Sequence, residues 1–188
     1  MPRPHLLPAL LLSLGCSDTT PPQPPCDAAC EDGIALRALR ETLKLVYNLT
    51  LQGNPVGEQD ESTPCTLAGS ARVFGAASAE PEHGATIVDL TYELRGCRHI
   101  ELDEEADETY EMSIDGTLTQ SGIIAAQPSA TTALLMRSGS LTLEGTVHDP
   151  PRPYSAEDCV IELGQNGSRI AGTLCGRDVG TNLGGPPF

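Results

Sequence analysis

The sequence predicts a mainly β domain. We expect an antiparallel meander, curved or partly closed into a barrel, with one N-terminal amphipathic helix packed on it. Apolar side chains recur at helical spacing over residues 34–46. After Pro64 several segments alternate apolar and polar side chains, which is typical of half-buried antiparallel strands. With 188 residues, the chain has room for one domain of ordinary size.

The helix is expected to begin at Glu31-Asp32-Gly33. Asp32 can cap the free amide groups of the first turn, and Glu31 suits the positive end of the helix dipole. Residues 47–51 fit a helix or a strand, and the segment 53–55 ends the element in either case. The apolar stripe of this helix consists of Ile34, Ala38, Leu39, Leu43 and Val46.

Three segments alternate most clearly, and their predicted inward faces are Val88, Leu90, Tyr92 and Leu94; Tyr110, Met112, Ile114 and Leu118; and Leu135, Leu141, Leu143 and Val147. A weaker strand covers residues 65–75. Segments 159–163 and 170–175 flank Asn166-Gly167, a dipeptide that strongly favours a hairpin turn. The predicted domain spans residues 31–188 and ends in an irregular C-terminal tail.

A glycine-spaced pattern recurs in residues 69–75 (GSARVFG), 116–122 (GTLTQSG) and 139–145 (GSLTLEG). Glycines inside strands mark bulges, sharp curvature or the close approach of another backbone. A sheet that bends repeatedly can wrap a helix or begin to close. Chance is the alternative, since Gly, Ser and Thr are common in exported β proteins.

The first residues are typical of an exported protein. Arg3 and the amino terminus form a short positive region, followed by an apolar stretch from Leu6 to Leu14. This stretch is too short to span a bilayer, which takes roughly 20 residues. Charges interrupt every later apolar run. We therefore expect residues 1–15 to be a signal peptide and the protein not to be an integral membrane protein.

Residues 12–16 (LSLGC) resemble the lipobox of bacterial lipoproteins, in which Leu, a small residue and Gly or Ala precede Cys. Gly15 and Cys16 match the pattern, whereas Leu12 stands one place early and Ser13 occupies the leucine position. The resemblance implies that Cys16 receives a diacylglyceryl group, becomes the N-terminus and carries acyl chains such as palmitate. Residues 13–15 also fit an ordinary signal peptidase site, cleavage at which would release a soluble protein.

Residues 16–30 are predicted to contain the lipid-anchored cysteine and a proline-rich tether. Residues 17–25 read SDTTPPQPP, which favours an extended polyproline II path of roughly 28 Å at about 3.1 Å per residue. Such a spacer suits a membrane anchor. We expect the protein to be exported and held by lipid in the bacterial cell envelope, at the outer membrane or cell surface rather than the inner membrane.

The chain has seven cysteines, and acylation of Cys16 would leave six that can form disulfides. An even set in an exported protein predicts disulfides, although six cysteines allow fifteen connectivities. A simple meander would pair Cys65 with Cys97 and Cys159 with Cys175, leaving Cys26 and Cys30 as a local loop. Strict alternation opposes this pairing, because it puts Cys97 on the polar face and Cys175 on the face opposite Leu174.

The strands, the glycine pattern and the final CVIEL…GTLCG segment (159–176) resemble uncharacterised exported β proteins and lipoproteins of Gram-negative bacteria. The resemblance covers roughly residues 64–176. It implies a β-sheet fold and no particular activity.

The strong negative charge of the chain argues against nucleic acid as a partner. A product starting at Cys16 has 10 Lys and Arg against 26 Asp and Glu, hence a formal charge of −16. Such a surface repels nucleic acid and anionic lipid headgroups. We interpret the acidity as favouring solubility.

The sequence lacks the known catalytic and metal-binding patterns. The acidic run at residues 101–108 lacks the spacing of a calcium loop, and we interpret it as a solvated loop. The histidines at 5, 83, 99 and 148 lack metal-ligand spacing. Cys26-x-x-x-Cys30 is not the redox C-x-x-C motif, and no nucleophile elbow, phosphate loop or zinc-protease motif occurs. We expect no enzyme, no metal and no cofactor.

The leading hypothesis is therefore a membrane-tethered envelope lipoprotein with a non-enzymatic binding or structural role. The alternative is a carrier of an apolar, acyl-chain-like ligand within the curved sheet, with the helix as its lid. A hydrolase whose catalytic triad escapes motif search is a third hypothesis. Neither the ligand nor a protein partner follows from the sequence.

Overall fold

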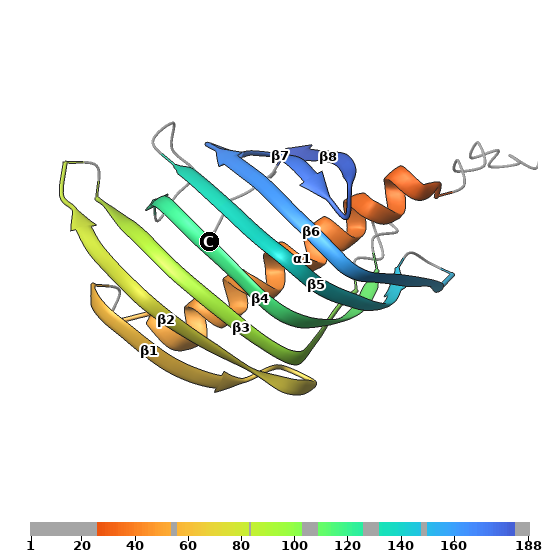
Figure 1. Cartoon of the computed structure of the whole chain (residues 1–188), viewed down its shortest axis with the longest axis horizontal. Coiled ribbons are helices and arrows are strands. Elements are labelled where there is room, and N and C mark those ends of the chain that lie inside the picture. Colours follow the sequence, from red (N-terminus) through yellow and green to blue (C-terminus); the bar gives the residue numbers. More distant parts are fainter. Residues whose placement is uncertain are drawn as a thin grey trace, which may run out of the picture.

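One helix lies across a curved eight-stranded sheet (Figure 1). The computed structural model describes residues 26–53, 56–82, 84–102, 109–125, 132–147 and 150–182. The elements are α1 (Ala28–Leu51), β1 (Gly57–Pro64), β2 (Ala68–Glu80), β3 (Ala85–Glu101), β4 (Tyr110–Ala125), β5 (Ala133–Val147), β6 (Arg152–Asn166), β7 (Arg169–Leu174) and β8 (Arg177–Asn182). The signal peptide, Cys16 and the proline-rich segment lie outside the described residues.

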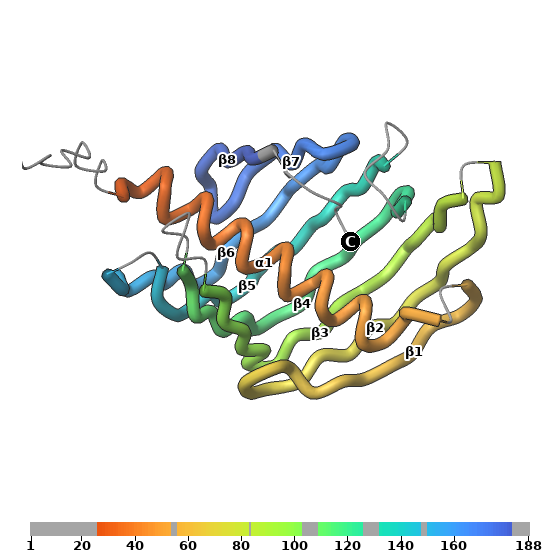
Figure 2. The backbone as a smooth tube through the Cα atoms, turned by 180° about the vertical axis from the view of Figure 1, so that it is seen from behind, coloured from red at the N-terminus to blue at the C-terminus, as the bar shows by residue number. Residues whose placement is uncertain are grey.

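The strands pair antiparallel in chain order, so β1 and β8 form the two edges and the sheet is not closed into a barrel. Seen from behind, α1 crosses the concave face diagonally from the side of β8 to the side of β1 (Figure 2). The predicted fold class, a mainly β antiparallel meander with one N-terminal helix packed on it, is confirmed. No helix among the described residues is long and apolar enough to cross a membrane.

The start of the helix corrects the sequence analysis. Asp27 is the N-cap, and its Oδ1 accepts a hydrogen bond from the Cys30 amide at 3.0 Å. Asp32 is not the cap. It lies in the second turn and is 3% exposed. The helix thus starts inside the segment assigned to the tether and runs to Leu51, which settles residues 47–51 as helical.

The apolar face of α1 fills the concave side of the sheet. Leu36, Leu39 and Leu43 belong to the same buried cluster as the inward side chains of β2 to β7. The inward face predicted for β3 is buried throughout, and so is that of β4. Since each such side chain contributes about 1.5–3 kcal/mol when fully buried, this layer is the main source of stability.

The inward face predicted for β5 is wrong in its first half. Leu134 and Met136 are buried, whereas Leu135 is only half-buried. The pairing of β5 with both neighbours is irregular between Ser138 and Leu141. An irregularity of this kind adds a residue on one strand and therefore reverses which side chains face inward.

The same effect removes the objection that concerned Cys97, whereas Cys175 lies beyond the last residue of β7 and is not part of its alternation. The β3–β4 register shifts between Leu94 and Cys97, with Gly96 at φ +56°, so Cys97 turns inward. The structure contains the disulfides Cys26–Cys30, Cys65–Cys97 and Cys159–Cys175. The pairing expected for a simple meander is thus confirmed, and the three disulfides indicate an oxidising, extracytoplasmic location.

The second glycine of each repeat lies where a neighbouring strand comes close. A Cβ atom at Gly75, Gly122 or Gly145 would lie 2.2, 2.1 or 1.9 Å from a backbone carbonyl oxygen of the adjacent strand. The predicted close approach of another backbone is confirmed at these positions. The sequence analysis assigned no strand to residues 177–182, which form β8.

Candidate functional site

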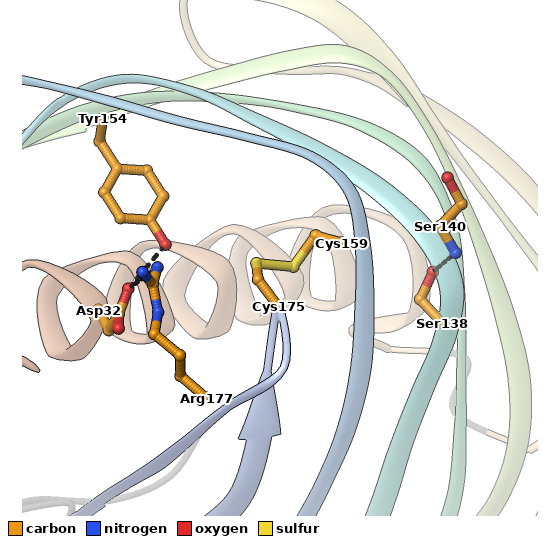
Figure 3. Close-up of a disulfide and its surroundings, with 7 residues drawn as sticks. All are labelled: Asp32, Ser138, Ser140, Tyr154, Cys159, Cys175 and Arg177. Atoms are coloured by element: carbon orange, nitrogen blue, oxygen red, sulfur yellow. Dashed lines mark hydrogen bonds and ion pairs between the residues drawn. A yellow bond between two sulfur atoms is a disulfide. The ribbon is translucent and has the colours of Figure 1, made fainter. Parts of the chain in front are cut away.

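A buried carboxylate joins the start of α1 to the last strands of the sheet (Figure 3). Asp32 Oδ1 accepts a hydrogen bond from the Tyr154 hydroxyl at 3.1 Å and one from Arg177 Nη2 at 2.6 Å. We call Asp32 of α1, Tyr154 of β6 and Arg177 of β8 the Asp32 cluster. The Asp32 side chain is 4% exposed, whereas that of Arg177 is 52% exposed. The guanidinium thus supplies the counter-charge that a buried carboxylate requires.

A second arginine holds the residues just before the cluster. Arg152 of β6 donates from Nη1 to the Cys26 carbonyl oxygen at 2.5 Å, and its Nε lies 3.3 Å from Glu31 Oε1. The Cys26–Cys30 disulfide closes the same turn. The point at which the chain enters the domain is therefore fixed to β6 by side-chain contacts and to α1 by a covalent bond.

Tyr154 keeps its proton in this environment. Burial, followed by the charge of Asp32 and the hydrogen bond to it, raises the pKa of Tyr154 to about 12, and Arg177 opposes this effect only in part. The neutral phenol is thus able to donate its proton to the hydrogen bond with the buried carboxylate. The cluster therefore links α1, β6 and β8, and both hydrogen bonds are accepted by the same oxygen, Asp32 Oδ1.

The outer face of the sheet has an open hollow of about 460 Å³ where β4 and β5 separate. It is lined by Gly116, Thr117, Thr119, Arg137, Ser138, Gly139 and Ser140. Two of its four hydroxyl groups bridge that separation. Ser138 Oγ donates to the Thr117 carbonyl oxygen at 2.6 Å, and Thr119 Oγ1 donates to the Arg137 carbonyl oxygen at 3.3 Å. Arg137 also pairs with Glu162 at 2.8 Å. These contacts explain the polar lining without a ligand.

His99 lies in a structural contact beside the first residue of β4. Its Nδ1 lies 3.3 Å from Thr66 Oγ1, its Nε2 lies 3.7 Å from Glu101 Oε2, and its ring centroid is 6.0 Å from that of Tyr110. The Tyr110 hydroxyl is buried and has no hydrogen-bond partner among the described residues. Burial, followed by the charges of Glu101 and Glu41, raises the pKa of Tyr110.

Metal ligands do not gather in the described ranges, which contain no group of three His, Cys, Asp or Glu side chains able to hold an ion. Residues 103–108 of the acidic run and the histidines at 5, 83 and 148 lie outside these ranges. The six cysteines predicted to form disulfides are all paired. Cys16 lies outside the described residues, so its lipidation stays a prediction.

The role of Asp32 differs from the helix cap expected from the sequence, and Tyr154 and Arg177 were not among the expected site residues. One signal was present. Asp32 precedes Leu36 by four residues and Leu39 by seven, so helical spacing places it on the buried stripe of α1. Its partners could not be found in the same way, because Arg177 is 145 residues away along the chain.

Comparisons with family models, with curated proteins and with solved structures found no match to this chain.

Proposed function

We propose that this protein is a lipoprotein of the cell envelope, anchored through acyl chains on Cys16 and held off the membrane by the proline-rich residues 17–25. Its domain has a non-enzymatic binding or structural role. The observation that carries the proposal is the reinforced start of α1. Arg152 holds the Cys26 carbonyl and Glu31, and the Cys26–Cys30 disulfide closes the first turn.

This arrangement suits the attachment point of a tether. A helix end that is not fixed frays easily, because its first amide groups lack partners. A load on residues 17–25 reaches the domain at Cys26. The Arg152 and Asp32 contacts pass that load to β6 and β8, and the disulfide keeps it from unwinding the first turn.

The contacts of the buried polar side chains support a non-enzymatic role. Asp32 holds Tyr154 and Arg177, and the Tyr92 hydroxyl donates to Gln120 Oε1 at 2.8 Å within the core. Ser138 bridges the separation between β4 and β5. Each of these groups is used to hold neighbouring elements together.

The test is cell fractionation with intact-mass measurement of the full-length protein and its Cys16→Ser variant. We expect the wild type in the membrane fraction, with a mass that includes acyl chains and lacks the six hydrogens of three disulfides. The variant should lose both the acyl mass and the membrane association, with unchanged thermal stability. Unmodified Cys16 in the wild type, or membrane association of the variant, would overturn the lipid anchor.

The apolar-ligand alternative requires α1 to leave the concave face, since Leu36, Leu39 and Leu43 occupy that space. Native mass spectrometry of the extracted protein distinguishes the two roles. A folded protein without bound lipid supports the proposal, and a stoichiometric non-covalent lipid contradicts it.

A further inference from the structure

The outer face of the sheet, which is turned toward the viewer in Figure 1, carries four apolar side chains on three neighbouring strands. Each of them is next in the sequence to a buried residue of the core, so it points away from α1. Ile87 of β3 is 44% exposed and pairs with Ile123 of β4, which pairs with Ala133 of β5. Leu135 lies two residues further along β5 and, like Ile123, is half-buried. We call these four residues the outer strip.

An unpaired charge lies on each side of the outer strip. Asp89 of β3 and Arg169 of β7 are exposed, and each precedes a buried residue of the core, which places both on the outer face. Arg169 is the only Lys or Arg among the described residues without an ion pair or a hydrogen bond, and Asp89 has neither within the same ranges. In contrast, Arg137 on the same face pairs with Glu162 at 2.8 Å. One charge of each sign is thus available to a partner.

The two charges are placed symmetrically about β5, which lies midway between β3 and β7 in the strand order. The row of paired residues that starts at Asp89 passes through Leu135 and reaches Ala171 of β7, two residues from Arg169. With about 4.8 Å between strands, the two charges are roughly 20 Å apart and Leu135 lies near the middle. A two-fold axis that lies along the face and passes close to Leu135 therefore brings Asp89 of each copy to Arg169 of the other.

We propose that the outer strip is the contact surface between two copies of this chain. Both copies use the same surface, so the ion pair between Asp89 and Arg169 forms twice. The apolar side chains between the two ion pairs lose contact with water, and Leu135 of one copy meets Leu135 of the other near the axis. A second copy fits this surface because the strip presents one unpaired charge of each sign, at positions that the two-fold axis exchanges.

The expected association is weak. The sheet curves around α1, so its outer face is convex and two copies touch only around the strip (Figure 2). The formal charge of −15 per chain also opposes association, although salt screens charges that are more than about 8 Å apart at physiological ionic strength. Because small interfaces of this kind belong to transient complexes, we expect a dissociation constant of roughly 10–100 µM.

Analytical ultracentrifugation measures the association. The full chain is used with Cys16→Ser, so that no acyl chain can hold copies together, over about 1 to 500 µM protein in about 0.15 M salt. We expect monomers at the lowest concentration and dimers at the highest, without larger species, because a two-fold contact closes on itself. Monomers at every concentration would overturn the proposal and leave the strip to a different partner. Open-ended assemblies would overturn the two-fold arrangement.

Charge reversal on the same Cys16→Ser chain locates the contact. Arg169→Glu and Asp89→Arg should each raise the dissociation constant at least about tenfold, because each places two pairs of like charges in the dimer. The combination Asp89→Arg/Arg169→Glu should restore the dissociation constant to within about threefold of the starting value, since both ion pairs form again with opposite polarity.

Arg95→Glu is the matched control for Arg169→Glu. Arg95 is 75% exposed and lies outside the outer strip, and its reversal changes the net charge of the chain by the same amount. We expect it to change the dissociation constant by no more than about twofold. Equal effects of Arg95→Glu and Arg169→Glu, or a combined variant that associates as weakly as the single ones, would overturn the contact between Asp89 and Arg169.

Discussion

Asp32 carries its charge inside the fold because two side chains from distant strands supply what water would otherwise supply. The Tyr154 hydroxyl donates a hydrogen bond and stays protonated at ordinary pH, and the Arg177 guanidinium supplies the positive charge. The carboxylate thereby fixes the orientation of α1 relative to β6 and β8. Packing of leucines alone specifies that orientation less sharply, because apolar contacts have no direction.

Because of Tyr154, the free energy of unfolding should fall as the pH rises into the alkaline range. Its pKa is raised from 10.0 to about 12 in the fold, so the folded state favours the neutral phenol. The resulting stability is fully present below pH 10 and is lost as pH rises to about 12, at up to about 1.4 kcal/mol per pH unit.

Tyr154→Phe removes this contribution. We expect the variant to be less stable at pH 7 by about 1.5–3 kcal/mol, because it loses a hydrogen bond to a charged group. Its unfolding free energy should then fall less steeply than that of the wild type above pH 10. Urea unfolding at a series of pH values measures both effects. Parallel curves for the two proteins above pH 10 would show that Tyr154 is not responsible for the pH dependence.

Neighbouring strands approach closely at the glycines that end the sequence repeats. Gly122 has φ +123°, and a Cβ there would lie 2.1 Å from the Ala133 carbonyl oxygen of β5. We expect Gly122→Ala to lower the unfolding free energy by at least about 2 kcal/mol, because it combines backbone strain with overlap of backbone atoms.

Gly33→Ala is the matched control for that substitution. Gly33 lies in α1, and no atom apart from its chain neighbours and the backbone of its own helix is within 4 Å of the position where its Cβ would be. The change should stabilise the protein by up to about 1 kcal/mol through helix propensity. Denaturant unfolding compares the two variants. A Gly122→Ala variant as stable as the wild type would mean that β4 and β5 can separate at no cost.

The elements themselves were largely predictable, whereas the changes of face within them were not. Alternation is a local pattern, so it correctly gave the inward faces of β3 and β4. It failed at Leu135, and it counted against Cys97, because an extra residue in a strand reverses the alternation without a clear mark in the sequence. Asp32 shows the same limit in the candidate site. Asp32 was expected to be the helix cap, although helical spacing is consistent with a place on the buried stripe, and nothing local pointed to Arg177.

In the described part of the chain, the domain is a sheet with two edge strands, β1 and β8, and a single covering helix. The strands from β2 to β6 are long and their pairing is interrupted by bulges, and the sheet curves enough for α1 to reach side chains from β2 to β7. Among the described elements, α1 alone covers the concave face, so the inward side chains of the sheet would be exposed to water without it. Helix and sheet should therefore unfold together in one cooperative transition.

Leu39→Ala tests that dependence. Leu39 is 1% exposed at the centre of the helix–sheet layer, so its truncation leaves a cavity and should cost about 2–5 kcal/mol. Leu49→Ala is the matched control on the same helix. Leu49 is 56% exposed, and its loss should change stability by no more than about 0.5 kcal/mol. Far-ultraviolet circular dichroism and near-ultraviolet tyrosine signals should give the same midpoint in each protein. A helix signal that melts before the tyrosine signal in Leu39→Ala would show that the sheet persists without α1, and that the helix is a cover rather than part of the core.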